Sequence, residues 1–228
     1  MSLFAIADTH LSFASNKPMD DFEGWLNYTD RLKENWNKII DDKDYVVIAG
    51  DISWAMNFDE LKADFDYINR LNGKKIILKG NHDYWWNTMS KMNKFIEENN
   101  FNTISILHNN AFDFDDFSVC GSRGWVFDSD EEQNEKVLNR EVMRIKTSIE
   151  SALNCEKIVF LHYPPVYENQ CCEEIVNLLK EKGIKKCYYG HIHGVAAKYA
   201  FDDNYDGIDF KLISADRLNF MPLLIKKF

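Results

Sequence analysis

Short apolar segments of strand length alternate with amphipathic helical patterns along most of the chain. The apolar segments, each followed by polar residues, are Leu3–Ala7, Tyr45–Ala49, Lys75–Lys79 and Lys157–Leu161. Between residues 57 and 72, apolar residues recur every three or four positions and Gly73 follows the last of them, which predicts a helix. Similar patterns predict helices over 28–42, 87–99, 132–153 and 171–182. This alternation is typical of an α/β sheet whose buried strands are covered by helices.

The last part of the chain has a different pattern. After a short strand at Lys186–Tyr189, the segments Val195–Phe201, Gly207–Ile213 and Met221–Lys226 are predicted to be successive strands without helices between them. An antiparallel stretch that follows a mixed α/β layer predicts two sheets packed face to face. We therefore expect an α/β fold, a four-layer α-β-β-α sandwich of two mixed β-sheets flanked by helices. No repeat or linker divides the chain, so one domain over residues 1–228 is expected.

The charge balance narrows the classes of partner. The 228 residues include 27 Lys and Arg against 37 Asp and Glu, a formal net charge of −10, which disfavours nucleic acid and anionic membranes as partners. The acidic run 128–132 is expected to form a solvated turn and a helix start. No segment approaches the ~20 apolar residues of a membrane span, and the start lacks the features of a signal peptide. Five cysteines without a CxxC pair favour free thiols in a reducing, cytoplasmic setting.

Five of the six histidines stand at the ends of predicted strands or just after them, and four of these five lie within two residues of an Asp, Asn or Gly. The segments are Asp8-Thr9-His10, Gly80-Asn81-His82-Asp83, His162 and Gly190-His191-Ile192-His193-Gly194, and Gly50-Asp51 closes another strand. Because the carboxyl ends of parallel strands open onto one crevice, these side chains are expected to converge. Residues at i and i+2 point the same way in extended backbone, so Asp8 and His10 can share one ion.

A mixed set of imidazole, carboxylate and amide ligands suits first-row divalent ions better than calcium. The set is too large for one tetrahedral zinc ion. Two ions about 3.5–4 Å apart, bridged by a carboxylate and a hydroxide, would use all of these ligands. Their positive charge would favour a phosphate group despite the acidic surface.

The motif series D-x-H, G-D, G-N-H-D, H and G-H-x-H resembles that of the calcineurin-like metallophosphoesterases, and the flanking residues resemble a bacterial branch of predicted phosphohydrolases. The resemblance implies that Asp8, His10 and His193 hold a first metal, that Asp51 bridges, and that Asn81, His162 and His191 complete a second. It implies two divalent transition-metal ions, manganese, iron or zinc, and attack by a bridging hydroxide. His82 would donate a proton to the leaving group, with Asp83 as its orienting partner.

The sequence departs from the phosphoprotein phosphatases of this family. No arginine follows Gly50-Asp51, where Ser53-Trp54-Ala55 stands, and residue 83 is Asp in place of Glu. Phosphate could instead be bound by Arg123 or Arg217, which lie in Gly- or Asp-containing segments after predicted strands, since a guanidinium binds phosphate through two hydrogen bonds. The alternative for both is a surface or structural ion pair.

Tryptophans are concentrated near the motifs: Trp54, Trp85, Trp86 and Trp125. They could form an aromatic wall for a nucleobase or apolar leaving group, or fill space between helices and a sheet. Trp54 and Trp125 are predicted to be the exposed pair, and hence candidate substrate-binding residues.

These observations predict a dinuclear phosphohydrolase that cleaves a small phosphomonoester or phosphodiester. One alternative is a non-catalytic scaffold of the same fold that binds a protein partner, although the ligands and the acid are intact. Another is a nuclease of the family, which the acidic charge disfavours. No oligomeric state is predicted.

Overall fold

The computed structural model describes residues 1–125, 135–168 and 170–228. Its first sheet has the order β13-β1-β2-β3-β4. The strands are β1 (Ser2–Ile6), β2 (Tyr45–Ala49), β3 (Lys74–Leu78), β4 (Ile104–Ile106) and β13 (Leu223–Lys227). The first four strands are mutually parallel, whereas β13 pairs antiparallel with β1. The first sheet is therefore mixed.

The second sheet has the order β11-β12-β10-β7-β6-β5. Its strands are β5 (Phe112–Asp113), β6 (Phe117–Ser122), β7 (Glu156–Leu161), β10 (Lys186–Tyr189), β11 (Asn204–Tyr205) and β12 (Ile208–Leu212). The four central strands are parallel and both edge strands are antiparallel. A separate hairpin joins β8 (Val166–Tyr167) to β9 (Gln170–Cys171).

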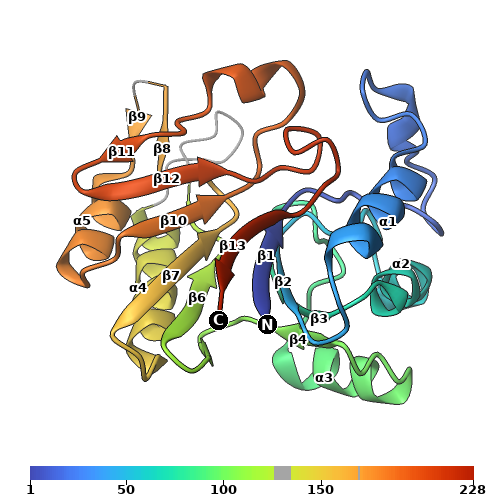
Figure 1. Ribbon diagram of the computed structural model, residues 1–228, viewed down its shortest axis with the longest axis horizontal. Helices are drawn as coiled ribbons and strands as arrows, with labels where there is room; N and C mark the ends of the chain where they lie inside the picture. The colour runs from blue at the N-terminus through green and yellow to red at the C-terminus, as the bar shows by residue number, and fades with distance from the viewer. Residues whose placement is uncertain (126–134, 169) are drawn as a thin grey trace.

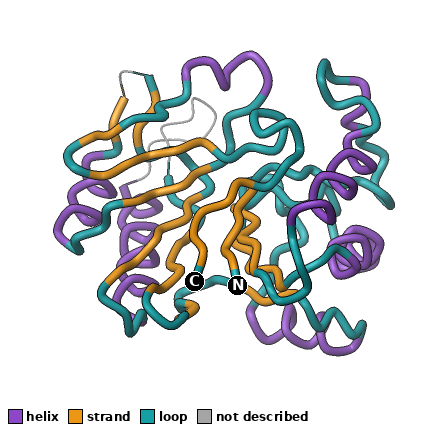
Figure 2. Tube along the Cα trace, in the orientation of Figure 1, coloured by secondary structure: helices purple, strands orange, loops and turns teal. Residues whose placement is uncertain are grey.

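Helices cover the outer face of each sheet (Figures 1 and 2). The helices α1 (Tyr28–Ile39), α2 (Phe58–Arg70) and α3 (Met89–Glu98) lie on the first sheet, and α4 (Glu135–Ser151) and α5 (Glu173–Glu181) lie on the second. At the start of α2, the Asn57 side chain accepts a hydrogen bond from the Glu60 N–H, which explains why the helix begins there. The predicted α-β-β-α sandwich of two mixed sheets is confirmed. None of the described helices is long and apolar enough to cross a membrane.

The alternation of side chains along β1 explains how the layers pack. Leu3 and Ala5 face the second sheet, where they meet residues such as Phe117 and Phe160. Phe4 and Ile6 face the helices on the opposite side. Because successive residues of a strand point to opposite faces, one apolar strand fills two cores.

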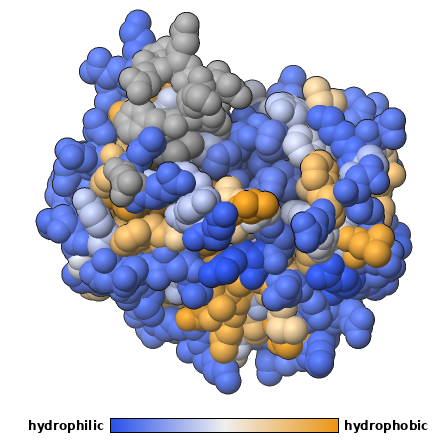
Figure 3. Space-filling view, turned by 90° about the horizontal axis from the view of Figure 1, so that it is seen from above, coloured by the Kyte–Doolittle hydropathy of each residue, from blue (hydrophilic) through white to orange (hydrophobic). Residues whose placement is uncertain are grey.

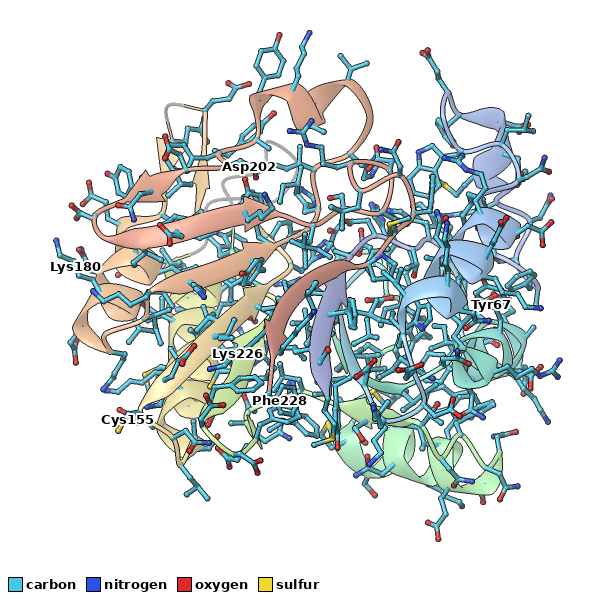
Figure 4. All side chains as sticks on the ribbon, viewed as in Figure 1. Tyr67, Cys155, Lys180, Asp202, Lys226 and Phe228 are labelled. Carbon is cyan, nitrogen blue, oxygen red and sulfur yellow. The ribbon has the colours of Figure 1, made fainter. Side chains whose placement is uncertain are left out.

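The C-terminal strand, β13, connects the two sheets through side-chain contacts near the N-terminus. Lys226 of β13 lies 2.8 Å from a Glu156 carboxylate oxygen and 3.0 Å from an Asp116 carboxylate oxygen, both in the second half of the sandwich (Figure 4). The ring of Phe228 packs against Phe114 and Phe117. The termini consequently lie side by side, with the Met1 amino group 2.9 Å from the Phe228 carbonyl oxygen (Figure 1).

Part of the prediction for the last third of the chain was wrong. Val195–Phe201 is not a strand, since Gly194–Tyr199 forms a 3₁₀ helix (η2) that begins at a glycine with φ of 61°. The predicted antiparallel run is also divided, because β12 lies parallel to β10 and β13 joins the first sheet. The acidic run 128–132 and the predicted start of the helix at 132 lie outside the described residues.

Candidate metal centre

The carboxyl ends of strands from both sheets meet at one edge of the sandwich, in the upper middle of Figure 1. The first sheet contributes Asp8, His10, Asp51 and Asn81, and the second contributes His162, His191 and His193. Figure 3 looks onto this edge and shows a mostly hydrophilic surface. All the predicted ligands therefore come from the edge at which the parallel strands of both sheets end.

The Asp51 carboxylate lies between two groups of candidate ligands. Its Oδ2 atom is 3.8 Å from His10 Nε2, and its Oδ1 atom is 3.4 Å from His162 Nε2. The ligand atoms of Asp8, His10 and Asp51 lie within 4.8 Å of one another, and so do those of Asp51, His162 and His191. Asp51 is the member that both groups share.

The remaining predicted ligands adjoin these two groups. Asn81 Oδ1 lies 2.7 Å from His162 Nε2 and 3.0 Å from His191 Nδ1, so its amide oxygen stands with the second group. The His193 ring centroid lies 5.2 Å from that of His10, beside the first group. This arrangement matches the division of ligands that the resemblance implies.

Several buried polar atoms of the site have no hydrogen-bond partner among the described residues. They are both ring nitrogens of His10 and Oδ2 of Asp51, in side chains that are 0% and 1% exposed. An unsatisfied buried polar atom costs about 1–3 kcal/mol, so such atoms are rare in the interior of a protein. A divalent cation takes an imidazole nitrogen or a carboxylate oxygen as a ligand, so one ring nitrogen of His10 and Oδ2 of Asp51 fit a metal ion.

Burial also shifts the proton equilibria of the ligands. It raises the pKa of Asp8 and of Asp51, and the neighbouring carboxylates add to the shift at Asp51. It lowers the pKa of His10 and of His162 well below the ordinary value. Neutral imidazoles are competent metal ligands, and a bound cation would favour the ionised carboxylates.

Four of the candidate ligands have left-handed backbone. The φ angles of Asp8, His10, Asp51 and His191 are 56°, 43°, 50° and 71°. Hydrogen bonds hold these turns, among them one of 2.9 Å from the His10 N–H to the Asp51 carbonyl oxygen. Gly80 permits the closest approach, since a Cβ there would lie 2.1 Å from Asp51 Oδ1. Strained backbone of this kind persists where the surrounding structure holds it, as at functional sites.

His82 lies at the open side of the site. Its backbone N–H donates to Asp51 Oδ1 at 2.8 Å, and its Nε2 atom is 4.0 Å from Asp51 Oδ2. Its Nδ1 atom lies 3.0 Å from the hydroxyl of Tyr84, a contact that the sequence interpretation missed. The side chain is 30% exposed, so it can reach both the metal ligands and a bound substrate.

Asp83 is fully buried and accepts hydrogen bonds from two loops. The donors are the N–H groups of Ile52, Ser53 and Gly80 and the indole of Trp85. Burial raises the pKa of Asp83 to about 6, although these hydrogen bonds act in the opposite direction. These contacts give Asp83 a role in holding the loops that carry Asp51 and Asn81, and its orienting role toward His82 stays a prediction.

Aromatic rings surround the first ligand group. Trp54 stacks on His10 with centroids 4.9 Å apart and also packs on His82 at 4.4 Å. Trp25 contacts both His10 and His193 at 6.0 and 6.2 Å. Sequence interpretation missed Trp25, although it stands in the long segment directly after the first strand. The prediction that Trp125 is exposed was wrong, because it is 2% exposed and packs in the core beneath α4 and α5.

The two candidate arginines have different surroundings. The Arg123 carbonyl oxygen accepts hydrogen bonds from the N–H groups of His162 and Tyr163, and its guanidinium carbon is 5.6 Å from the Tyr163 ring centroid. That ring lies 4.5 Å from the ring of His191, so Arg123 adjoins the second ligand group. Arg217 is half exposed, and its guanidinium lies 3.8 Å from an Asp202 carboxylate oxygen. This contact is the surface ion pair that was the alternative to phosphate binding.

Comparisons with known proteins agree with this geometry. The sequence profile of the calcineurin-like phosphoesterases matches residues 1–195. An uncharacterized protein of Methanocaldococcus jannaschii is 34% identical over 86 residues, 36% of this chain and 46% of that protein, so the chain covers less than half of that relative. That match leaves most of both chains unaligned.

Solved structures show the same fold. A phosphopantetheinyl hydrolase from Mycobacterium tuberculosis superposes with a TM-score of 0.57 and 13% identity, over 100% of this chain and 96% of that one. A protein of unknown function from Aquifex aeolicus superposes with a TM-score of 0.51 and 16% identity, over 98% of this chain and 95% of that one. Since the profile spans most of the chain and its motif residues meet at one edge, where they could hold a metal ion, this chain belongs to the calcineurin-like phosphoesterase family of metal-dependent hydrolases.

Proposed function

We propose that this protein is a dinuclear phosphohydrolase that cleaves a small phosphomonoester or phosphodiester. The observation that carries the proposal is the sharing of Asp51 by two candidate ligand groups, with Oδ2 of Asp51 lacking a hydrogen-bond partner among the described residues. Asp8, His10 and His193 would hold one divalent cation, and Asn81, His162 and His191 the other. Manganese, iron and zinc all suit these ligands.

When bound, the two cations supply the charge that activates water and stabilises phosphate oxygens. The protein would hold the candidate ligands in place, so that they need not rearrange when the cations bind. The His162 Nδ1 atom lies 3.0 Å from the Ala49 carbonyl oxygen, and a hydrogen bond there leaves Nε2 free to act as a ligand. The Asp8 carboxylate accepts the His191 N–H at 2.9 Å, which ties the two sheets together at the site.

His82 is proposed to protonate the leaving-group oxygen. It stands beside Asp51 but outside both ligand groups, and its ring is partly exposed. An imidazolium donates a proton near neutral pH, and such general-acid catalysis contributes about 10²–10⁴-fold. Tyr84 is placed to orient the ring through its contact with Nδ1.

Arg123 is proposed to bind the phosphate, with Trp54 forming part of the substrate-facing wall. Arg123 is half-buried beside Tyr163, and Trp54 covers the His10 and His82 rings. Arg217 is a weaker candidate because Asp202 already lies beside it. The acidic surface disfavours a nucleic-acid substrate.

The test is phosphate release or nitrophenol release by the purified protein with and without added metal. We expect turnover of p-nitrophenyl phosphate or bis-p-nitrophenyl phosphate that manganese, iron or zinc stimulates and a chelator abolishes. The ester that is cleaved faster indicates the class to screen. A metal-loaded protein that cleaves neither ester, nor any small phosphate ester, would contradict the proposal and favour a non-catalytic scaffold.

A further inference from the structure

The long segment between β1 and α1 places a lysine beside the proposed proton donor. The ammonium nitrogen of Lys17 lies 4.4 Å from the ring centroid of Trp54 and 5.7 Å from that of Tyr84. The Trp54 ring in turn lies 4.4 Å from the His82 ring, and the Tyr84 hydroxyl contacts His82 Nδ1 at 3.0 Å. Both aromatic rings beside the Lys17 ammonium therefore contact His82.

Contacts on both sides of Lys17 fix this part of the segment. Before it, the Phe13 N–H donates to the buried carboxylate of Asp64 on α2 at 2.9 Å. After it, Met19 is 4% exposed, and its sulfur atom lies 3.4 Å from the indole nitrogen of Trp54. The packing of the segment thus holds Lys17 at the Trp54 ring.

No neighbouring carboxylate neutralises the charge of Lys17. Among the described residues, no carboxylate oxygen lies within 4.0 Å of its ammonium group, and the side chain is exposed. The acidic residue nearest to it in the sequence, Asp20, accepts the Asn27 N–H at 2.8 Å. The ammonium group can therefore bind an anion, and it attracts an oxyanion more strongly than it attracts an aromatic ring.

The position of Lys17 indicates which part of a substrate it would meet. Since His82 is proposed to protonate the leaving-group oxygen, the leaving group must lie against His82 and the side chains around it. These side chains are Trp54 and Tyr84, with the Lys17 ammonium beside both rings. Arg123 adjoins the second ligand group instead, where it is proposed to bind the phosphate that is hydrolysed.

The ammonium group also distinguishes between the kinds of leaving group that this wall would accept. A flat apolar group would have to displace Lys17 in order to stack on the ring faces of Trp54 and Tyr84 that the ammonium covers. An anionic group would pair with the ammonium and would require no such displacement. The arrangement therefore favours a charged leaving group over a stacked one.

We propose that Lys17 is a specificity-determining residue, whose ammonium binds a carboxylate or phosphate on the leaving group. The inference rests on the proposed function and narrows its substrate class to phosphate esters with a negatively charged leaving group. The anion would lie only a few bonds from the ester oxygen, because the rings beside Lys17 contact His82 directly. An ammonium group acts as a point charge and suits either oxyanion.

The test compares the hydrolysis of matched esters by the manganese-loaded protein. Each is an alkyl phosphate of two to four carbons that ends in a carboxylate, a phosphonate or a neutral carboxamide, prepared as the monoester and as its methyl diester. Release of the variable alcohol is measured. We expect kcat/KM to be about 10-fold higher for the better oxyanion than for the carboxamide of the same length. Because Lys17 is exposed, this preference should decrease as the salt concentration rises.

Variants assign the preference to Lys17. Lys17→Met removes the charge and should reduce kcat/KM for the oxyanion esters about 10-fold more than for the carboxamides, whereas Lys17→Arg should retain most of the preference. The matched control is Lys38→Met, which removes an exposed charge in the last turn of α1, at the end of the sheet where β2 begins, and should change neither series. Melting temperatures report whether the variants fold, and the comparison in the unaltered protein requires no variant.

Binding measured without turnover separates this inference from the proposed function. Analogues in which a methylene group replaces the ester oxygen should bind about 10-fold more tightly by calorimetry in their oxyanion forms. No preference in either kinetics or binding contradicts the role of Lys17, and so does an equal loss on both series in Lys17→Met. No turnover of any ester, with the binding preference intact, contradicts the proposed function alone.

Discussion

Buried polar groups at the two ends of the first sheet differ in whether the protein supplies their hydrogen-bond partners. Where the strands begin, Lys75 donates to the carbonyl oxygens of Leu71 and Gly73 at 2.6 and 2.7 Å. Asp44 accepts from two backbone N–H groups at 2.8 and 2.9 Å. Where the strands end, both ring nitrogens of His10 and one oxygen of Asp51 have no hydrogen-bond partner among the described residues.

This difference separates structural polar groups from functional ones. At the beginning of the sheet the chain satisfies its own buried charges, so these groups contribute to stability. At the opposite end the chain leaves an imidazole and a carboxylate oxygen that a divalent cation could bind, as the proposed function requires. Substitutions at the two ends should therefore affect different quantities, stability at one and metal binding with turnover at the other.

The shared ligand should give the largest effect. We expect Asp51→Asn to reduce turnover by about 10⁴-fold, because both cations lose a ligand and their common bridge. The stability of the metal-free protein should be unchanged or higher, since the variant removes a buried carboxylate but keeps the oxygen that accepts the His82 N–H. Metal analysis, turnover and thermal unfolding measure the three quantities.

The matched control is Asp66→Asn on the exposed side of α2, which should alter none of them. Full turnover and full metal content in Asp51→Asn would refute its bridging role.

Separate substitutions should distinguish the two ligand groups. His10→Asn and His162→Asn are each expected to lower turnover by about 10³-fold and to remove one cation while the other is retained. The physical reason is that each imidazole belongs to only one group. Titration with manganese, followed by calorimetry, measures the number of sites in each variant. Identical loss of all metal in both would indicate a single ion in place of two.

The proton donor should affect chemistry without affecting metal content. We expect His82→Ala to retain its metal and to lose about 10²-fold in kcat on alkyl phosphates. The loss should be much smaller on nitrophenyl esters, whose leaving group needs no proton. The ratio of kcat values for the two kinds of ester measures this directly. Equal losses on both would count against a general acid at this position.

At the end of the sheet where the strands begin, a substitution should lower stability and leave metal content and kcat unchanged. Asp44→Ala leaves the N–H groups of Ser2 and Asp41 without their acceptor, which should cost about 1–3 kcal/mol of the free energy of unfolding. Metal content and kcat should be unchanged. Denaturant unfolding and a turnover assay at a temperature well below the melting point check both parts. A large loss of kcat would show that the two ends are not independent.

Substitution of the buried Lys75 should have the smallest effect, a change in how the free energy of unfolding depends on pH. Burial lowers the pKa of Lys75 to about 7, below its ordinary value of 10.5. Between pH 7 and 10.5 the unfolded chain therefore binds more protons at this position, and this site makes stability rise with pH. In Lys75→Met the rise should be smaller over the same range. An unchanged pH dependence would mean that the Lys75 ammonium stays charged in the fold.

The convergence of the candidate ligands could be predicted from sequence because each of them stands within a few residues of the end of a strand. Short apolar runs locate strands such as β1 and β2, and parallel topology brings their ends together without further information. Asp8 and Asp51 thus needed only local sequence and one general rule. The sandwich of two sheets was predicted from this alternation together with an antiparallel last third of the chain, which the structure instead divides between the two sheets.

Other features depend on contacts between distant segments. β13 pairs with β1 more than two hundred residues earlier, and no local pattern distinguishes that partner from β12. Trp25 reaches His10 only because the segment before α1 folds back over the site. The strand β6 contains two serines and a glycine among its buried residues, so it lacks the apolar run by which strands are found.

Anomalous X-ray scattering from crystals grown with manganese would test most directly whether two cations share Asp51. We predict two anomalous peaks about 3.5–4 Å apart, one on each side of the Asp51 carboxylate. His10 and His193 should lie next to one peak, and His162 and His191 next to the other. A single fully occupied peak, or two peaks that do not both contact Asp51, would contradict the account.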